Sequence, residues 1–149
     1  MKRLYLDTSV FCFDKEFMEW TLKLIEEIKM GLKTVVISDL TLKELKEASI
    51  NIRNLVNEIP EEYKEYVTLN DEAYKLAEHY IEEGIVSEVN RVDAQHIAIA
   101  TVNKIDVLVS WDFRHIVNTT KMQLYNYVNL KYNYPQLEIK SPRELLSKT

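Results

Sequence analysis

The chain has 149 residues, of which 46% are hydrophobic and 29% are charged, and its formal net charge at pH 7 is −5. This composition fits one globular domain with a hydrophobic core and excludes a disordered chain. The single cysteine, Cys12, excludes an internal disulfide framework and argues against a cysteine-based zinc site. No apolar run approaches the ~20 residues of a membrane helix, and no secretory hydrophobic region is present, so we expect a cytoplasmic protein without membrane contacts.

The first half of the chain predicts alternating strands and helices. Residues 3–6 form a short strand that ends at Asp7, and a helix over about residues 15–31 begins at Asp14 and stops at Gly31. Its apolar residues at helical spacing are Phe17, Met18, Leu22, Ile25 and Ile28. Residues 34–38 predict a strand buried on both faces, followed by a helix over about residues 41–48. Residues 50–68 predict an irregular helical stretch interrupted by Pro60.

The second half continues this alternation. Asn70 begins a helix to about Glu83, and Asn90 begins another. Residues 106–110 predict a buried strand, residues 115–124 a helix, and residues 126–132 and 136–140 further strands. Ser141 and Glu144 match a capping box, which predicts a last short helix. The whole pattern predicts an α/β fold, a three-layer α/β/α sandwich around a mainly parallel sheet, in a single domain of residues 1–149.

Four acidic residues stand where a predicted strand ends or a predicted helix begins. They are Asp7, Glu44, Asp93 and Asp112. Parallel α/β sheets gather such positions at the carboxyl edge of the sheet, where these folds place their ligand sites. Clustered carboxylates repel one another unless they are protonated or bridged by a cation, and hard oxygen ligands suit Mg2+ or Mn2+. The set therefore predicts metal-dependent phosphodiester chemistry.

Each acid also has an ordinary structural explanation when it is considered alone. Asp7 and Asp112 fit turn or cap residues. Thr41 and Glu44 match a capping box, and Asp93 lies early in a predicted helix, where the helix dipole favours an anion. The functional interpretation depends on the ordered combination, and on the strands before Asp7 and Asp112 both being central in the sheet.

The four acids belong to short segments with a characteristic order. These segments are residues 6–10 (LDTSV), Ser38-Asp39 with Thr41 and Glu44, residues 93–100 (DAQHIAIA), residues 110–113 (SWDF), and the tail over residues 137–146. In this order and spacing the chain resembles the PIN-domain nucleases, which include the toxins of many prokaryotic toxin–antitoxin pairs. The resemblance covers nearly the whole chain.

The resemblance implies a fold, an activity and partners. It implies a metal-dependent endoribonuclease that cleaves single-stranded or structured RNA with Mg2+ or Mn2+ and leaves a 5′ phosphate and a 3′ hydroxyl. The catalytic and metal-binding residues carried over are Asp7, Glu44, Asp93 and Asp112. It also implies a homodimer and a small antitoxin protein as a partner.

Other polar residues are predicted near the acids. Hydroxyl or amide groups that support the carboxylates are expected from Thr8, Ser9, Ser110 and Asn118. Arg114 and His115 are candidates for contacts with RNA. His96 follows Asp93 by three residues, and we expect a buried or supporting histidine rather than a metal ligand. Tyr127 and Tyr132, in a tyrosine- and lysine-rich segment, would either stack on bases or, more commonly, fill strands or a subunit contact.

Three alternatives remain open. Two-metal nucleases with an RNase H-like fold carry acids in a similar order but begin with consecutive antiparallel strands, whereas a long helix follows the first strand here. Phosphatases with an aspartyl nucleophile commonly carry a second aspartate two residues on, where Ser9 stands. The third alternative is a catalytically inactive PIN-like module that binds RNA or protein. The net charge of −5 argues against tight RNA binding, although basic residues outnumber acidic ones over residues 104–149.

Overall fold

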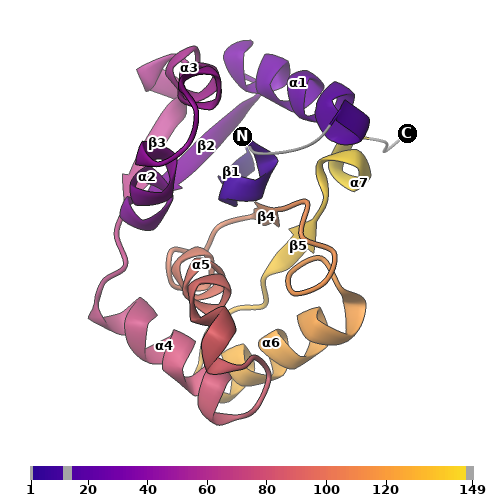
Figure 1. Cartoon of the computed structure of the whole chain (residues 1–149). Helices are drawn as coiled ribbons and strands as arrows, with labels where there is room; N and C mark the ends of the chain where they lie inside the picture. Colours follow the sequence, from indigo (N-terminus) through magenta and orange to yellow (C-terminus); the bar gives the residue numbers. More distant parts are fainter. Residues whose placement is uncertain (1, 12–14, 147–149) are drawn as a thin grey trace.

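The fold is a central parallel sheet between two layers of helices (Figure 1). A computed structural model describes residues 2–11 and 15–146, in which a five-stranded sheet has the order β3-β2-β1-β4-β5. The strands are β1 (Lys2–Leu6), β2 (Lys33–Ser38), β3 (Lys64–Val67), β4 (Val107–Val109) and β5 (Glu138–Lys140). All neighbouring strands pair in parallel, so their carboxyl ends share one edge.

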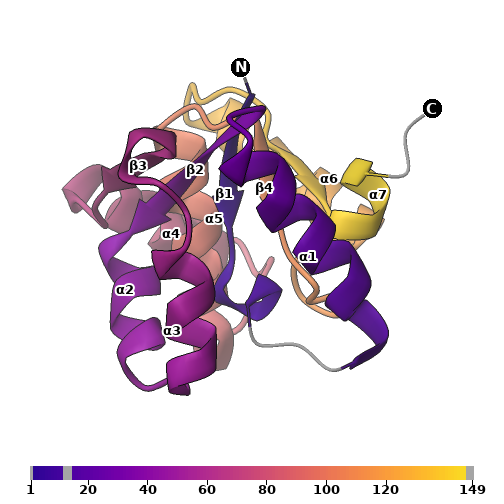
Figure 2. The ribbon, with the colours of Figure 1, turned by 90° about the horizontal axis from the view of Figure 1, so that it is seen from above.

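The helices divide between the two faces of this sheet. One layer contains α1 (Lys15–Lys29), α2 (Asp39–Lys46), α3 (Ile50–Asn57) and α7 (Pro142–Leu146), and the other contains α4 (Asp71–Glu82), α5 (Arg91–Val102) and α6 (Thr119–Lys131). Seen from above, the first layer lies in front of the strands and the second behind them (Figure 2). The predicted three-layer α/β/α sandwich is therefore confirmed.

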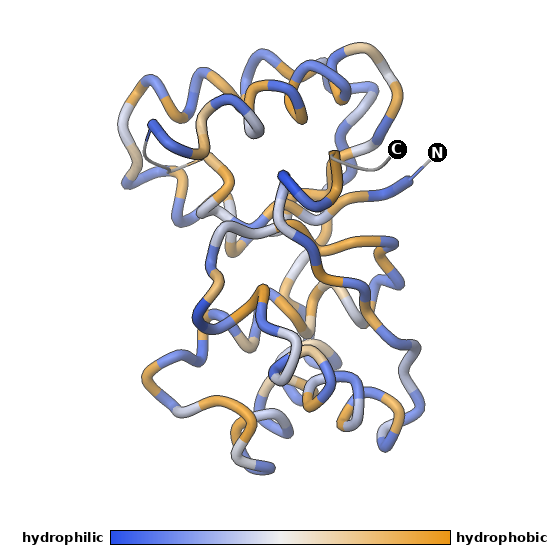
Figure 3. Tube along the Cα trace, turned by 90° about the vertical axis from the view of Figure 1, so that its right-hand side faces the viewer, coloured by the Kyte–Doolittle hydropathy of each residue, from blue (hydrophilic) through white to orange (hydrophobic). Residues whose placement is uncertain are grey.

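Strand alternation divides the core into two parts. Leu4 and Leu6 of β1 pack in the cluster with α1 and α7, whereas Tyr5 packs in the cluster with α4, α5 and α6. Because both faces of the strand are covered, its residues Leu4 to Leu6 are all fully buried or nearly so. The strands through the middle of the molecule are accordingly mostly hydrophobic, while the helices alternate (Figure 3).

Several local signals act as the sequence predicts. Asn70 caps α4 by accepting a hydrogen bond from the backbone N–H of Ala73 at 2.9 Å. The capping box before α7 is also present, because Glu144 Oε1 accepts from the Ser141 N–H and Ser141 Oγ accepts from the Glu144 N–H. Gly31 follows α1 with a φ of +79°, which favours glycine at that position. Asp14, the predicted start of the first helix, and Cys12 lie outside the described residues.

Two predicted segments are wrong. Residues 50–68 are not one irregular helix but α3, a 3-10 turn over Glu61–Tyr63 and the edge strand β3, whose polar sequence KEYV lacks the apolar character of a buried strand. Residues 126–132 are not a strand, and the helix expected at 115–124 begins later, because α6 runs from Thr119 to Lys131. Tyrosine and valine favour strands by propensity, but Tyr125 and Val128 here recur at helical spacing and bury one face of α6.

The buried face of α1 also differs from the expected one. Thr21, Leu24, Ile25 and Ile28 are buried, whereas Met18 and Leu22 are 41% and 44% exposed. Within the part of the chain that the structure describes, no helix is both long enough and apolar enough to cross a membrane.

Candidate active site

Asp7 and Asp112 lie at the ends of two neighbouring strands. Asp7 directly follows β1, and Asp112 follows β4 after a short turn. The strands are paired with Leu6 opposite Val109, and the backbone N–H of Asp7 donates to the Val109 carbonyl at 2.9 Å. Since β1 and β4 are adjacent inner strands, the sheet brings both carboxylates to the same part of its carboxyl edge.

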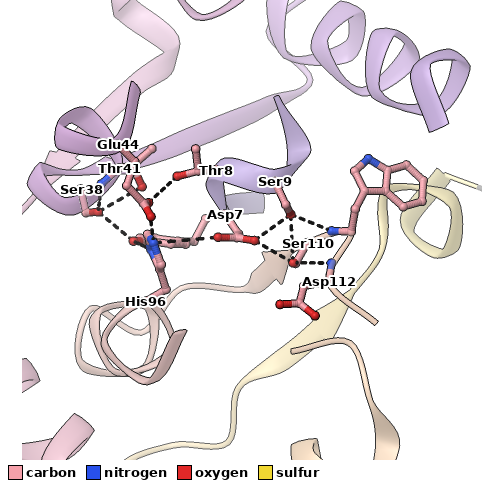
Figure 4. A network of polar contacts seen from close by, with 11 residues as sticks. Asp7, Thr8, Ser9, Ser38, Thr41, Glu44, His96, Ser110 and Asp112 are labelled. Carbon is pink, nitrogen blue, oxygen red and sulfur yellow. Dashed lines mark hydrogen bonds and ion pairs between the residues drawn. The ribbon is translucent and has the colours of Figure 1, made fainter. Parts of the chain in front are cut away.

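The Asp7 carboxylate is buried and held by two hydroxyls. Its side chain lies among the polar groups drawn in Figure 4, and the residue is only 7% exposed. Oδ2 accepts hydrogen bonds from Ser9 Oγ at 2.7 Å and from Ser110 Oγ at 2.8 Å. Oδ1 lies 3.9 Å from Nε2 of His96. The hydroxyls predicted at Ser9 and Ser110 therefore do orient this carboxylate.

Glu44 lies inside α2 and turns toward Asp7 rather than toward the helix start. The cap of α2 is Ser38, whose Oγ accepts from the Thr41 N–H at 3.1 Å, so the capping-box explanation of Glu44 is wrong. Glu44 Oε1 instead accepts from Thr8 Oγ1 at 2.6 Å and contacts His96 Nε2 at 2.9 Å. Burial raises the pKa of Glu44, but the hydrogen bonds from His96 and Thr8 outweigh it and lower the pKa below its ordinary value.

His96 joins this carboxylate to the core. It is 1% exposed, and its Nδ1 lies 2.6 Å from the Tyr5 hydroxyl, which in turn lies 2.8 Å from Ser38 Oγ. Because the Glu44 carboxylate can only accept, Nε2 is the donor in that contact. Burial lowers the pKa of His96, but the hydrogen bond to Glu44 and the charge of Asp7 raise it above its ordinary value overall. The expected supporting histidine is confirmed as a buried group that holds Glu44.

Tyr5 is a member of this network that the sequence reasoning missed. Burial raises the pKa of its hydroxyl far above the ordinary value, so the group stays protonated and can donate to His96. The available signal was strand alternation, because a polar-tipped residue between Leu4 and Leu6 must point to the opposite face, where α5 packs. That Tyr5 contacts His96, however, can be known only from how α5 is positioned against β1.

Asp93 lies in the first turn of α5, partly buried. Burial and the negative charges of Asp112 and Asp7 raise its pKa to about 6, against smaller opposing effects of His115 and His96. The charge effects among these causes are consistent with Asp7, Asp93 and Asp112 lying near one another. The raised pKa also shows that the negative charge at Asp93 is incompletely balanced by the protein.

Asp112 is held by its own turn. Its Oδ1 accepts from the backbone N–H groups of Arg114 at 3.0 Å and His115 at 2.9 Å. Its own N–H donates to Ser110 Oγ at 3.0 Å, and the same hydroxyl reaches Asp7. One serine thus connects the turn that carries Asp112 with the carboxylate at the end of β1.

Two of the remaining predictions have a structural outcome. Asn118 caps α6, with Oδ1 accepting from the Lys121 N–H at 3.1 Å, and a place for its amide beside the acids stays a prediction. The tyrosine-rich segment is helical, so Tyr127 and Tyr132 do not share a strand face, and Tyr132 stacks on His79 with ring centroids 3.9 Å apart. RNA contacts by Arg114 and His115 stay a prediction.

The donor chemistry of the acids fits Mg2+ or Mn2+. Carboxylate and hydroxyl oxygens are the ligands that these ions prefer, and the raised pKa of Asp93 marks negative charge that a cation would balance. Over residues 2–11 and 15–146, however, no three His, Cys, Asp or Glu side chains lie close enough together to hold a metal ion as they stand. Glu44 and Asp112 each use one oxygen for hydrogen bonds within the protein.

The fold is similar to solved structures of VapBC toxin–antitoxin proteins. VapBC2 from Rickettsia felis, bound to a DNA fragment from its promoter, matches with a TM-score of 0.54 and 15% identity over 93% of this chain and 98% of that chain. DNA-bound VapBC from Salmonella typhimurium matches with a TM-score of 0.53 and 17% identity over 95% of this chain and 99% of that chain.

A third similar structure is that of VapC20 from Mycobacterium tuberculosis, described as a toxin that cleaves the sarcin-ricin loop. It has a TM-score of 0.53 and 16% identity over 75% of this chain and 92% of that chain. Comparisons with protein-family models and with curated protein sequences gave no match. The structural likenesses establish a PIN-like fold for this chain, as the sequence segments predicted.

Proposed function

We propose that this protein is a metal-dependent endoribonuclease of the PIN type. The observation that carries the proposal is the convergence of Asp7 and Asp112 at the ends of adjacent strands, with Asp93 near both. Burial and the charges of these two carboxylates together raise the pKa of Asp93 to about 6. A partly buried acid that faces other carboxylates costs stability when it is ionised, and such groups are typical of functional sites. The similarity in fold to VapC20, described as a sarcin-ricin loop cleaving toxin, supports RNA as the substrate.

In this proposal the four acids hold Mg2+ or Mn2+ and the neighbouring side chains hold the acids. Such a cation supplies a hydroxide from bound water near neutral pH and neutralises charge on the scissile phosphate. Ser9 and Ser110 fix the orientation of Asp7. Thr8 and His96 do the same for Glu44. No serine or cysteine nucleophile is required.

We further propose that the protein is the toxin of a toxin–antitoxin pair and acts as a homodimer. The similar VapBC structures are complexes of two proteins bound to DNA, which supports a small antitoxin as the partner of this chain. Growth arrest on expression of the protein, relieved by co-expression of the small protein encoded next to it, would test this role. Unimpaired growth on expression of an active nuclease would contradict it.

The activity is tested by cleavage of labelled RNA with purified protein. We expect cleavage with Mn2+ or Mg2+, none with EDTA, and a loss of about 100-fold or more in Asp7→Asn and Asp93→Asn, because each substitution removes a proposed ligand. Asp106→Asn is the matched control, since Asp106 precedes β4 at the opposite end and accepts from the Arg3 N–H at 2.7 Å. Full activity in folded Asp7→Asn would contradict the assignment, and RNA binding without any turnover would favour the inactive module.

A further inference from the structure

Three aromatic rings lie beside the acidic site. Phe17, at the start of α1, stacks on Trp111 with ring centroids 4.2 Å apart and an interplanar angle of 15°. The ring of Phe113 lies 6.1 Å from each of them, tilted by 56° and 58°. We call these three residues the aromatic platform.

The inner part of this platform is rigidly held. Trp111 is 7% exposed, and its indole N–H donates to Thr21 Oγ1 on α1 at 2.9 Å. Its backbone N–H donates to Ser9 Oγ at 3.0 Å, the same hydroxyl that binds Asp7. The position of Trp111 is therefore coupled to that of the buried carboxylate through one serine.

The outer ring is open. Phe113 is 48% exposed although it contacts two other rings, so part of its surface is available to a ligand. What distinguishes Phe113 from other exposed apolar side chains is its place in a cluster of three aromatic rings. Phe113 also follows Asp112 directly, which places it next to the acids by covalent structure alone.

One basic side chain follows Phe113 on this side of the acids. Arg114 is exposed and follows the ring in sequence, and His115 is near enough to lower the pKa of Asp93. A nucleic acid uses an aromatic face together with an adjacent cation. The open ring and the Arg114 guanidinium both lie next to the proposed phosphodiester site, which favours a nucleotide as the occupant.

We propose that Phe113 stacks on an unpaired base next to the scissile phosphate, with Phe17 and Trp111 supporting the ring from behind. This inference rests on the proposed ribonuclease function and assigns Phe113 as the residue that contacts the base beside the cleaved bond. A base inside a duplex stacks on its own neighbours and cannot present its face to the ring. Stacking is tolerant of base identity, so the platform selects unpaired structure rather than sequence.

The test measures binding of a fluorescent 12-nucleotide single-stranded RNA, in an Asp7→Asn background that prevents cleavage. A chain of the same length with abasic sugars serves as the second probe. We expect Phe113→Ala and Phe113→Leu to weaken RNA binding by about 5- to 100-fold and to leave binding of the abasic chain unchanged. Phe113→Tyr should restore RNA binding because it keeps the ring. Tyr74→Ala, a 50% exposed aromatic on α4, is the matched control and should have no effect.

The outcomes separate this inference from the function on which it rests. Normal RNA affinity in Phe113→Leu would overturn stacking, because leucine keeps apolar contact without a ring face. Equal losses of affinity for RNA and for the abasic chain would also overturn it. So would variants that bind RNA normally but no longer bind a protein partner, because the platform would then be a protein-docking surface. If the Asp7→Asn protein with Phe113 unchanged does not bind RNA at all, the ribonuclease proposal fails as well. Circular dichroism confirms that each variant is folded.

Discussion

Replacing Asp93 by asparagine should stabilise the metal-free protein, and the gain should depend on pH. Burial and the charges of Asp112 and Asp7 raise the pKa of Asp93 from 3.8 to about 6 in the folded state. That difference corresponds to about 3 kcal/mol of unfavourable free energy for the ionised folded form. Asparagine keeps the shape of the side chain and removes the charge.

The sign of the pH dependence follows from proton linkage. The folded protein holds this proton more tightly than the unfolded chain, so the stability of the wild type falls as the pH rises from about 4 through 6. Above that range the destabilisation by ionised Asp93 is complete. Asp93→Asn should therefore raise the free energy of unfolding by about 3 kcal/mol at pH 8 but by under about 1 kcal/mol at pH 4.

Urea denaturation in EDTA at the two pH values measures this difference directly. A gain of about 3 kcal/mol in a domain of this size raises the unfolding temperature by about 6 to 12 °C. Asp71→Asn is the control, because Asp71 is an exposed acid in the first turn of α4 and its change should stay within about 0.5 kcal/mol. A gain of equal size at pH 4 and pH 8 would refute the electrostatic reasoning, since packing effects do not titrate.

Three further predictions concern the same structure. Mn2+ at about 100 times its Kd should stabilise the wild type by about 2.7 kcal/mol in thermal unfolding, and Asp7→Asn should lose this effect. His96→Gln should cost about 1 to 3 kcal/mol in urea unfolding, because it disturbs buried hydrogen bonds to Glu44 and to the core; an unchanged midpoint would contradict that role. Gly31→Ala should lower the free energy of unfolding by over about 1 kcal/mol in urea unfolding, since φ is +79° and a Cβ would lie 2.9 Å from the ring of Tyr63. Gly84→Ala should lower it by less, because φ is +77° but a Cβ there would meet open space.

The sequence correctly predicted the helices and strands for which the spacing of apolar residues and the capping residues indicate the same element. The strands before Asp7 and around Val36, and the helix that Asn70 begins, are of this kind. The edge strand β3 could not be found because it is polar and only partly buried, so its sequence shows no alternation of hydrophobic and polar residues. The helix α6 was misassigned because tyrosine and valine favour strands locally, and packing against α4 and α5 decides otherwise.

The candidate site divides in the same way. The convergence of Asp7 and Asp112 follows from a general property of parallel sheets, so it could be predicted without coordinates. The role of Glu44 could not, because Ser38 and Thr41 are both chemically suitable caps and only the structure shows that Ser38 is used. The contact between His96 and Tyr5 depends on the height of α5 against β1, which no local pattern encodes.

The two ends of the acidic site differ in how their negative charge is balanced. Glu44 has a lowered pKa because His96 and Thr8 donate to it, whereas Asp93 has a raised pKa because burial and the charges of Asp112 and Asp7 disfavour its ionised form. A divalent cation therefore gains most on the Asp93 side, and there it also relieves repulsion that already destabilises the fold. We expect Asp93→Asn to weaken Mn2+ binding in calorimetry more than Glu44→Gln does. A larger loss of Mn2+ affinity in Glu44→Gln would mean that the Glu44 carboxylate leaves His96 to bind the metal. The charge balance of the metal-free protein would then not predict which acid contributes most to metal binding.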